Sequence, residues 1–434
     1  MMIGHAHGGG HGIALAPEEA DVMVVNTCGF IESAKEESID TILELVEIKK
    51  AHGNKRLIVT GCLSQRYGDE LAKEIPEVDV FLGSADYDKF AGVIGSKNAP
   101  SKRGRKTLPM LQISKKPDYI YDHNTPRILT GQNFSAHVKI AEGCDRPCAF
   151  CIIPKLRGAQ RSRPISSIVS EAQNLGSQGV KEINLIAQDL TRYGKDLDSK
   201  DNLAGLLQSL GSVESLEWIR LHYTYPSEFD DHLISVIKDT ANVANYIDVP
   251  MQHINDDMLK TMRRGHTSKI TRSLVDRLRS EMDDVVIRST FIVGHPGETD
   301  KSFQELADFI EEAQLDHVGA FTYSSEKGTH SATLEDAVPK DVALERKEIL
   351  MEIQRKISKE KNKMRIGTEM NVLVERESSE SEFLMEGRFY GQAPEIDGLV
   401  VLTDCEAAIG DMVRAKVTQS SDYDLVASAN QECW

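Results

Sequence analysis

Three cysteines within eight residues constrain this chain more than any other sequence feature. The stretch Gly143–Arg163 reads GCDRPCAFCIIPKLRGAQRSR and contains Cys144, Cys148 and Cys151 in a C-x3-C-x2-C spacing. Thiolates this close together can hold one metal centre, and three of them on a [4Fe-4S] cube leave one iron open to a small molecule. Zinc is the alternative, but it normally takes four ligands, and no second cysteine pair or nearby histidine follows Cys151.

The same spacing, with the aromatic Phe150 just before the last cysteine, is similar to that of radical S-adenosylmethionine (SAM) enzymes. Further sequence motifs in the chain resemble those of the bacterial methylthiotransferases, and most of all those of the branch that modifies an aspartate of small ribosomal subunit protein twelve. The resemblance covers roughly residues 17–430. Its words are VVNTCGFIESAKEESID (24–40), EGCDRPCAFCIIPKLRG (142–158), LIAQDLTRYG (185–194), DVPMQH (248–253), FIVGHPGET (291–299) and FTYSSEKGT (321–329).

Length and composition limit the class of protein, its compartment and its partners. A chain of 434 residues is long enough for about three domains. Its 51 basic and 68 acidic side chains leave a net charge of -17, which either attracts basic partners or simply keeps the surface solvated. The seven cysteines lack the spacing of a secreted protein, and no apolar run suits a signal peptide or a membrane span. We therefore expect a cytoplasmic protein without membrane contact.

The first 16 residues predict no packed structure, because His5, His7 and His11 alternate with glycines that supply nothing to bury. This start is typical of a tag or an altered N-terminus, and metal binding by its histidines is the alternative.

Residues 17–96 predict an open α/β domain that is truncated at its start. An apolar strand over 22–25 is followed by a turn over 26–29, and a second strand spans 56–60. Between the strands, Ser33 and Glu36 have the spacing of a helix capping box. The helix would bury one face made of Ile39, Ile42, Leu43 and Val46.

Cys28 and Cys62 each follow one of these strands, so they could converge at one edge of the sheet. Two small buried hydrophobic residues are the alternative reading. The resemblance implies a second [4Fe-4S] cluster held by three cysteines, of which NTCGF and VTGCLSQR match two. No cysteine precedes Cys28. Either the start is altered or the second cluster lacks a ligand.

Residues 97–134 predict a linker without a sustained apolar period. The linker is basic, which is usual for a solvated segment and is also compatible with nucleic-acid contact. Its basic residues are Lys102, Arg103, Arg105 and Lys106.

Residues 135–365 predict a partial (β/α) barrel. Six apolar strands centre near Ile140, Ile183, Ile219, Ile247, Ile292 and Ala320, with room for a helix between each pair. Active sites of barrel folds lie where strands end, and polar residues gather there. They are Gln188, Asp189, Gln252, His253 and His295, with Gly294 before the last. The charged run over 341–365 predicts a helix that closes this domain.

Residues 366–434 predict a small five-stranded barrel, which by resemblance is a TRAM domain, a module often used to hold RNA. Its strands are expected at 372–374, 385–389, 399–402, 412–417 and 423–426. Four basic and fourteen acidic residues leave this region a net charge of -10. Such a surface repels phosphates and suits a basic ribosomal protein.

The resemblance implies an enzyme that uses SAM twice, as radical source and as methyl donor. No catalytic side chain beyond the cluster ligands is assigned; Phe150 is expected to support the adenine, and Gln188 and Gln252 to contact SAM. A flavodoxin or ferredoxin is expected as electron donor. The predicted reaction is β-methylthiolation of an aspartate on small ribosomal subunit protein twelve. The alternatives are methylthiolation of a tRNA adenosine and a zinc-bearing RNA-binding adaptor without catalysis.

Overall fold

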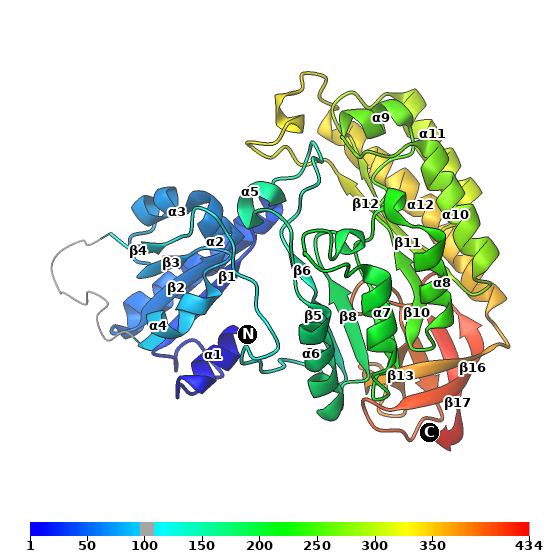
Figure 1. The fold of residues 1–434 in the computed structure, drawn as a ribbon, viewed down its shortest axis with the longest axis horizontal. Coiled ribbons are helices and arrows are strands. Elements are labelled where there is room, and N and C mark those ends of the chain that lie inside the picture. Colours follow the sequence, from blue (N-terminus) through cyan, green and yellow to red (C-terminus); the bar gives the residue numbers. More distant parts are fainter. Residues whose placement is uncertain (96–107, 434) are drawn as a thin grey trace. The chain divides into compact units, whose positions relative to one another are not determined.

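The structure, a computed structural model, describes residues 1–95 and 108–433, and the chain divides into two compact units (Figure 1). The first unit contains Met1–Leu129, Glu142–Arg161 and Ser324–Thr333, and the second contains Thr130–Ala141, Ser162–Tyr323 and Leu334–Trp434. The predicted basic cluster Lys102, Arg103, Arg105 and Lys106 lies outside the described residues. In the part that is described, no helix combines the length and the apolar character needed to cross a bilayer.

An open parallel sheet with flanking helices forms most of the first unit, as the sequence predicts. Its strands follow the order β1-β2-β3-β4, and Thr27 of β1 pairs with Gly61 of β2. Ile42 and Val46 of α2 are buried against this sheet. The elements are β1 (Val22–Thr27), α2 (Glu32–His52), β2 (Arg56–Gly61), α3 (Cys62–Glu74), β3 (Val80–Leu82), α4 (Phe90–Gly95) and β4 (Met110–Gln112).

Two details of the helix that follows β1 differ from the prediction. The N-cap residue of α2 is Ile31, without a side-chain cap bond, so Ser33 lies in the first turn and the predicted capping box is wrong. Starting two residues earlier places the Glu32 carboxylate at the helix N-terminus, where the helix dipole favours it. Leu43 is 45% exposed, because it lies next to the stripe that Ile42 and Val46 bury.

Two segments that were expected to lack regular structure are folded. Residues Met2–Gly8 form helix α1, where Ala6 packs with Phe90 and Val93 of α4. A Cβ on Gly4 would lie 2.3 Å from the carbonyl oxygen of Pro126, so the small residues of this start permit close packing. In the predicted linker, Met110–Gln112 form β4, which pairs with β3. Three residues are too few to show a period, so the sheet edge alone decides this strand.

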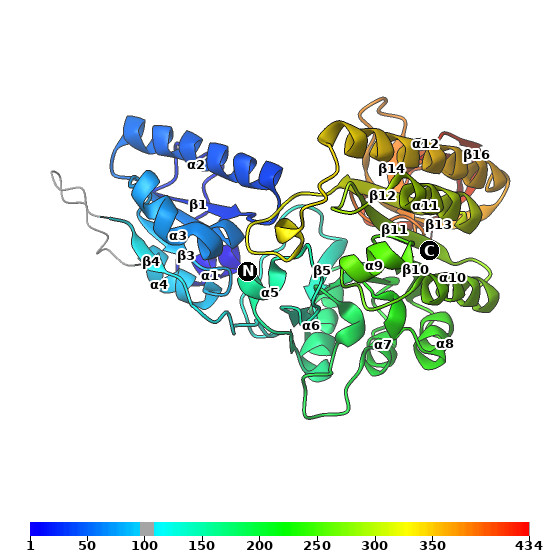
Figure 2. The same ribbon diagram turned by 90° about the horizontal axis from the view of Figure 1, so that it is seen from above.

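The second unit contains the six predicted barrel strands as one parallel sheet in the order β12-β11-β10-β9-β8-β5. Ile183, Ile219 and Ile247 are fully buried in it. Helices lie side by side along its outer face (Figure 2). The strands are β5 (Ser135–Lys139), β8 (Glu182–Ile186), β9 (Trp218–Leu221), β10 (Val243–Asp248), β11 (Val286–Val293) and β12 (His317–Thr322). The helices are α6 (Ile165–Ser177), α7 (Leu203–Gly211), α8 (Asp231–Asp239), α9 (Asp256–Thr261), α10 (Ser268–Glu281) and α11 (Asp300–Ala313). Two short strands flank the cysteine loop, β6 (Ala141–Glu142) and β7 (Arg161–Ser162).

A long helix and a closed five-stranded barrel complete the second unit, and both were predicted. The barrel order is β13-β14-β15-β17-β16, and its core contains Val372, Val400 and Leu425. The elements are α12 (Lys340–Met364), β13 (Glu369–Glu377), β14 (Met385–Phe389), β15 (Val400–Thr403), β16 (Met412–Ser420) and β17 (Leu425–Cys433).

A buried ionic cluster joins this small barrel to the six-stranded sheet. Glu182, the first residue of β8, accepts hydrogen bonds from Arg220 Nε at 2.9 Å and from Arg388 Nη2 of β14 at 2.7 Å. Burial alone would raise the pKa of Glu182, but Arg220 and Arg388 outweigh it and lower the pKa to about 2. The carboxylate therefore stays charged and ties three strands of two sheets together.

We predict that Glu182→Gln destabilises the protein, because it leaves two buried arginines without their shared anion, a loss of roughly 3 to 5 kcal/mol. The folded-state pKa of Glu182 is about 2, below the ordinary value of the unfolded chain. The Glu182 contribution is therefore complete above about pH 4.3 and lost as pH falls toward the folded-state pKa. Urea unfolding at pH 7, 4 and 3 measures this, and the gap between wild type and variant should shrink with acid. Exposed Glu214→Gln is the control, and equal stability of Glu182→Gln and wild type at pH 7 would contradict the prediction.

Candidate active site

The cysteine loop closes on itself within the first unit. Cys144 N donates to the Gly158 carbonyl at 3.1 Å, and Cys151 N donates to the Cys148 carbonyl at 3.2 Å. Gly143 has φ 82°, and a Cβ there would lie 2.1 Å from the Ala159 carbonyl oxygen, so only glycine fits this crossing. The loop leads into helix α5 (Ile153–Arg157).

The chemistry of this loop fits an iron–sulfur cluster. Its three sulfur donors are soft ligands of the kind that such clusters and zinc select. Cys144 is buried, and Cys148, Cys151 and Phe150 are half-buried. The Arg146 backbone N–H points at Cys144 Sγ from 3.4 Å, and hydrogen bonds to ligand sulfurs are a known determinant of cluster potential. Within residues 1–95 and 108–433, no three His, Cys, Asp or Glu side chains are grouped as ligands of one single ion.

Cys28 and Cys62 lie in two loops that touch. Each follows its strand directly, and the strands pair in register at Thr27 and Gly61. A Cβ on Gly29 would lie 2.8 Å from the carbonyl carbon of Cys62. Cys28 is exposed and Cys62 is buried. Parallel pairing thus brings the two cysteines to one edge of the sheet, where strand-end reasoning placed them.

Arg157, at the end of α5, contacts Cys62, although sequence reasoning gave it no role. Its Nη2 lies 3.4 Å from Cys62 Sγ, and its Nη1 donates to Glu142 at 2.9 Å. Burial alone would lower the pKa of Arg157, but the nearby Glu142 and Cys62 outweigh burial, so the pKa lies above its ordinary value. Tyr87 lies in the same surroundings, where burial raises its pKa to about 12. A permanent positive charge therefore faces the sulfur of Cys62.

A second buried pair holds the loop of Cys28. Glu326, in the FTYSSEKGT word, is 2% exposed and accepts from Arg66 at 2.7 Å and from Lys35 at 3.2 Å. Arg66 also donates to the Gly29 carbonyl at 2.9 Å. The word FTYSSEKGT could have indicated Glu326, but nothing in the sequence indicates its partners on α2 and α3.

In the second unit, the predicted polar residues follow the ends of parallel strands and so lie along one sheet edge. Gln188 follows β8, Gln252 follows β10 and His295 follows β11. Gln252 has φ 71°, a conformation that non-glycine residues rarely adopt. Its backbone is held on both sides, because it donates to Thr290 O at 2.8 Å and accepts from Ile292 N at 2.9 Å. The cysteine loop belongs to the other unit, so a pocket shared with it stays a prediction.

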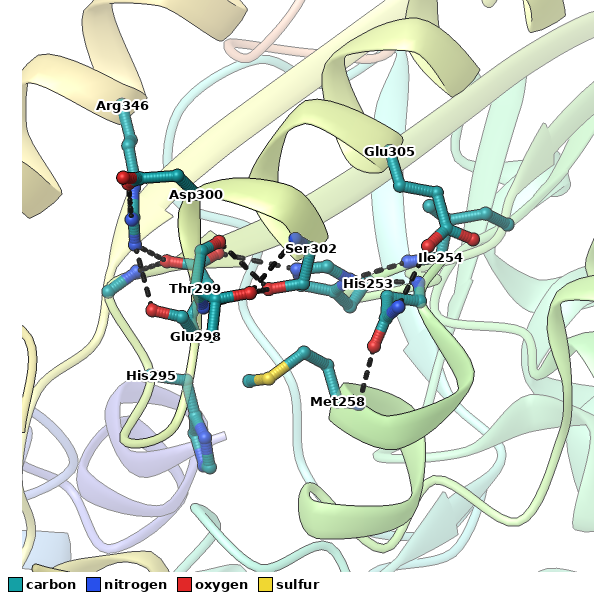
Figure 3. Close-up of polar contacts among 12 residues, drawn as sticks. His253, Ile254, Met258, His295, Glu298, Thr299, Asp300, Ser302, Glu305 and Arg346 are labelled. Atoms are coloured by element: carbon teal, nitrogen blue, oxygen red, sulfur yellow. Dashed lines mark hydrogen bonds and ion pairs between the residues drawn. The ribbon is translucent and has the colours of Figure 1, made fainter. Parts of the chain in front are cut away.

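Glu298 organises the turn after β11 (Figure 3). His253 Nδ1 accepts the backbone N–H groups of Ile254 and Asn255 at 2.9 and 3.0 Å, which places its proton on Nε2. That Nε2–H donates to Glu298 at 3.3 Å. The other oxygen of Glu298 accepts from Gly294 N and from Arg346 of α12 at 2.8 Å. Sequence reasoning missed Glu298 and Arg346, although FIVGHPGET contains the glutamate.

His295 points away from this network (Figure 3) and is fully buried. Burial lowers its pKa to about 4, so the ring is neutral at pH 7. Its Nδ1 lies 3.0 Å from the Pro296 carbonyl, which can only accept, so Nδ1 carries the proton and Nε2 is an acceptor. The ring packs edge-on against Tyr323 at 5.0 Å.

Three families match successive parts of the chain. The Radical SAM superfamily matches residues 138–310, the uncharacterized protein family UPF0004 matches residues 1–83, and the TRAM domain matches residues 366–429. The region that matches the Radical SAM superfamily contains the cysteine loop, and the region that matches UPF0004 contains Cys28 and Cys62.

Similar curated proteins match nearly the whole chain. "Ribosomal protein uS12 methylthiotransferase RimO" of Myxococcus xanthus is 46% identical over 427 residues, 98% of this chain and 87% of that protein. The protein of the same name from Geotalea uraniireducens is 45% identical over 98% of this chain and 94% of its own length.

Solved structures share the fold at low identity. The radical S-adenosylmethionine methyltransferase TsrM from Kitasatospora setae superposes with a TM-score of 0.52 at 15% identity, covering 69% of this chain and 61% of that one. The cobalamin-dependent S-adenosylmethionine radical enzyme OxsB gives a TM-score of 0.50 at 12% identity, covering 77% and 48%. At this identity the likeness concerns the fold alone.

We predict that His295 makes stability fall with acid in a window set by its pKa. The folded-state pKa of His295 is about 4, below the ordinary value near 6.5. Its neutral form therefore supports the fold fully above about pH 6.5, and the support is lost by roughly 1.4 kcal/mol per pH unit as pH falls toward 4. Unfolding of wild type and His295→Gln at pH 7.5, 6 and 5 measures this. The control is His232→Gln, at an exposed position of α8, and parallel pH curves for wild type and His295→Gln would refute the prediction.

Proposed function

We propose, because the chain belongs to the family of ribosomal protein uS12 methylthiotransferases, that it is a SAM-dependent radical enzyme that adds a methylthio group to an aspartate of small ribosomal subunit protein twelve. The observation that carries the proposal is the closed loop of Cys144, Cys148 and Cys151 in a chain that matches these transferases over 98% of its length.

The loop cysteines are proposed to hold one [4Fe-4S] cluster, with SAM at its open iron. When bound, the cluster and SAM together supply the carbon radical that removes hydrogen from an unactivated C–H bond, which no side chain can do. The protein chain positions SAM and the substrate and excludes water from the site. Phe150 supports the adenine from inside the loop, and Gln188 and Gln252 offer amide contacts from the sheet edge.

The rigidity of that edge supports this assignment. Gln252 is held by two backbone hydrogen bonds in a strained conformation, so the direction of its Cα–Cβ bond is fixed. Glu298 ties the turn after β11 to His253 and to Arg346, so three elements share one buried charge. A site held this way loses little entropy when it orders a ligand.

We further propose that Cys28 and Cys62 belong to a second iron–sulfur centre, which the resemblance to the methylthiotransferases implies. The support is their contact across the strand ends and the positive Arg157 beside Cys62. The resemblance implies three thiolates for this centre, and the structure brings two of them together, so we derive no reaction step from it.

The charge of the small C-terminal barrel supports a basic protein substrate. Three of its four basic residues are neutralised, because Arg388 is buried against Glu182, Arg376 pairs with Glu386 and Arg414 pairs with Glu369. Asp397 and Asp422 pair with Arg288 and Arg355 outside the barrel, but the barrel's fourteen acidic residues still outnumber its four basic ones. Such a field steers a basic protein toward the barrel, whereas binding tRNA needs free lysines and arginines to displace counterions.

The remaining expectations from the sequence are kept as proposals. We propose a cytoplasmic location and a flavodoxin or ferredoxin as electron donor. We also propose three domains, which span residues 17–96, 135–365 and 366–434. Residues 1–16 precede the first domain, and the linker 97–134 separates the first from the second.

We predict that replacing Cys144, Cys148 and Cys151 together by Ala abolishes SAM cleavage, because no thiolate remains to hold the cluster. After anaerobic reconstitution and dithionite reduction, the assay is 5'-deoxyadenosine formation with iron and sulfide counted per chain. Cys405→Ala, in the small barrel, is the matched control and should behave as wild type. A triple variant that still forms 5'-deoxyadenosine, or a colourless wild type that binds zinc, would refute the assignment.

We predict that the enzyme binds small-subunit protein twelve more weakly as salt rises, because the attraction is between an acidic and a basic surface. The measurement is the affinity at 50 and at 300 mM salt, since the Debye length shortens by a factor of about two to three between these concentrations. Mass spectrometry should show one SCH3 in place of hydrogen on its target aspartate. A methylthiolated tRNA adenosine with an unmodified ribosomal protein would overturn the substrate.

A further inference from the structure

A cluster of exposed lysines surrounds the cysteine loop. Lys115, Lys116, Lys155 and Lys327 are all exposed, and none of them forms an ion pair in the described parts of the chain. We call these four residues the lysine rim.

Two close contacts bring the three segments of the lysine rim together around α5. Lys155 Nζ donates to the Gly328 carbonyl at 2.7 Å, directly beside Lys327. A Cβ on Gly158 would lie 2.8 Å from the carbonyl oxygen of Pro117, the residue after Lys116. The segments that carry Lys116, Lys155 and Lys327 therefore meet at the helix that follows the three cysteines.

The sign of charge at this surface is opposite to that of the whole chain. Glu142 and Glu326 lie nearby, but both are buried and neutralised by Arg157 and Arg66. Asp118 and Asp145 are the exposed acids on the same segments. A local excess of positive charge in a chain of net charge -17 requires a reason beyond solubility.

An acidic partner would be repelled by most of this molecule and attracted to the lysine rim. Fields of this kind steer a partner and set its orientation more than they add affinity. The rim lies on the segments next to Cys144, Cys148 and Cys151, which is where an electron must enter if the loop holds a redox centre.

We propose that the lysine rim docks an acidic one-electron donor protein, a reduced flavoprotein or ferredoxin, against the cysteine loop. This inference rests on the proposed function. In the transfer the donor loses one electron and the centre held by the loop gains it, with no bond made or broken in the protein. Nucleic acid is the less favoured partner, because the positive surface is limited to the three segments that meet at α5 and the chain as a whole is acidic.

The test compares a protein donor with a small reductant in the reconstituted full chain. The variant is Lys115→Glu, Lys116→Glu and Lys327→Glu combined, since no hydrogen bond of these side chains holds the fold together. The matched control reverses two exposed lysines of the other unit, Lys269→Glu with Lys301→Glu. The readout is the initial rate of 5'-deoxyadenosine formation with a reduced acidic flavodoxin at 20 and 300 mM salt, and separately with dithionite.

The expected result is a rate at least tenfold lower for the rim variant with flavodoxin at low salt, and an unchanged rate with dithionite. The control variant should match wild type with both reductants, and salt should slow wild type only with flavodoxin. An unchanged flavodoxin rate in the rim variant would overturn the inference. So would a variant that keeps the flavodoxin rate but loses binding to ribosomal RNA, since that outcome assigns the rim to nucleic acid.

Failure of the proposed function gives a different result. A wild type that forms no 5'-deoxyadenosine even with dithionite, despite a full cluster by iron count, would refute the radical chemistry itself. A rim variant that also loses the dithionite rate or its iron would show that the lysines support the loop, and would overturn the docking role. The single variant Lys327→Glu then repeats the comparison with the least disturbance to the loop.

Discussion

Parallel pairing of strands is the constraint on which the rest of this structure depends. In both sheets of the α/β units, each strand runs the same way as its neighbour, so the residues that follow the strands reach one edge. That rule places Cys28 beside Cys62 in the first unit and aligns Gln188, Gln252 and His295 in the second. Most residues of the strands are buried, and the polar side chains expected to function follow the strand ends.

Buried carboxylates paired with arginines from distant elements hold the loops around those ends. Glu142 with Arg157, Glu326 with Arg66 and Glu298 with Arg346 share this arrangement. A buried pair adds little net stability over an apolar one, but removing one partner costs roughly 3 to 5 kcal/mol, so it strongly selects one arrangement of the loop. The same device joins the small barrel to the large sheet through Glu182.

The regular elements followed from periodicity wherever several residues reported the same pattern. All six strands of the large sheet and all five of the small barrel were predicted, because each is bounded by turns and has an apolar run. The last barrel strand was placed at 423–426, but it begins at Leu425 and continues to Cys433 beyond the apolar run. The elements that were not predicted correctly are short or have a locally ambiguous sequence. Helix α1 and strand β4 have too few residues to show a period, and the start of α2 was shifted because Ser33 and Glu36 mimic a capping box.

The sequence by itself determined the chemistry of the site, since three cysteines in C-x3-C-x2-C spacing form a donor set whatever surrounds them. It also determined which strand ends carry polar residues. Only the tertiary structure decided the partners of those residues. Arg157 lies 95 positions from Cys62, and Arg346 lies 48 positions from Glu298. Local sequence carries no signal for which carboxylate or sulfur a long guanidinium side chain meets, because packing of separate helices and loops chooses the pair.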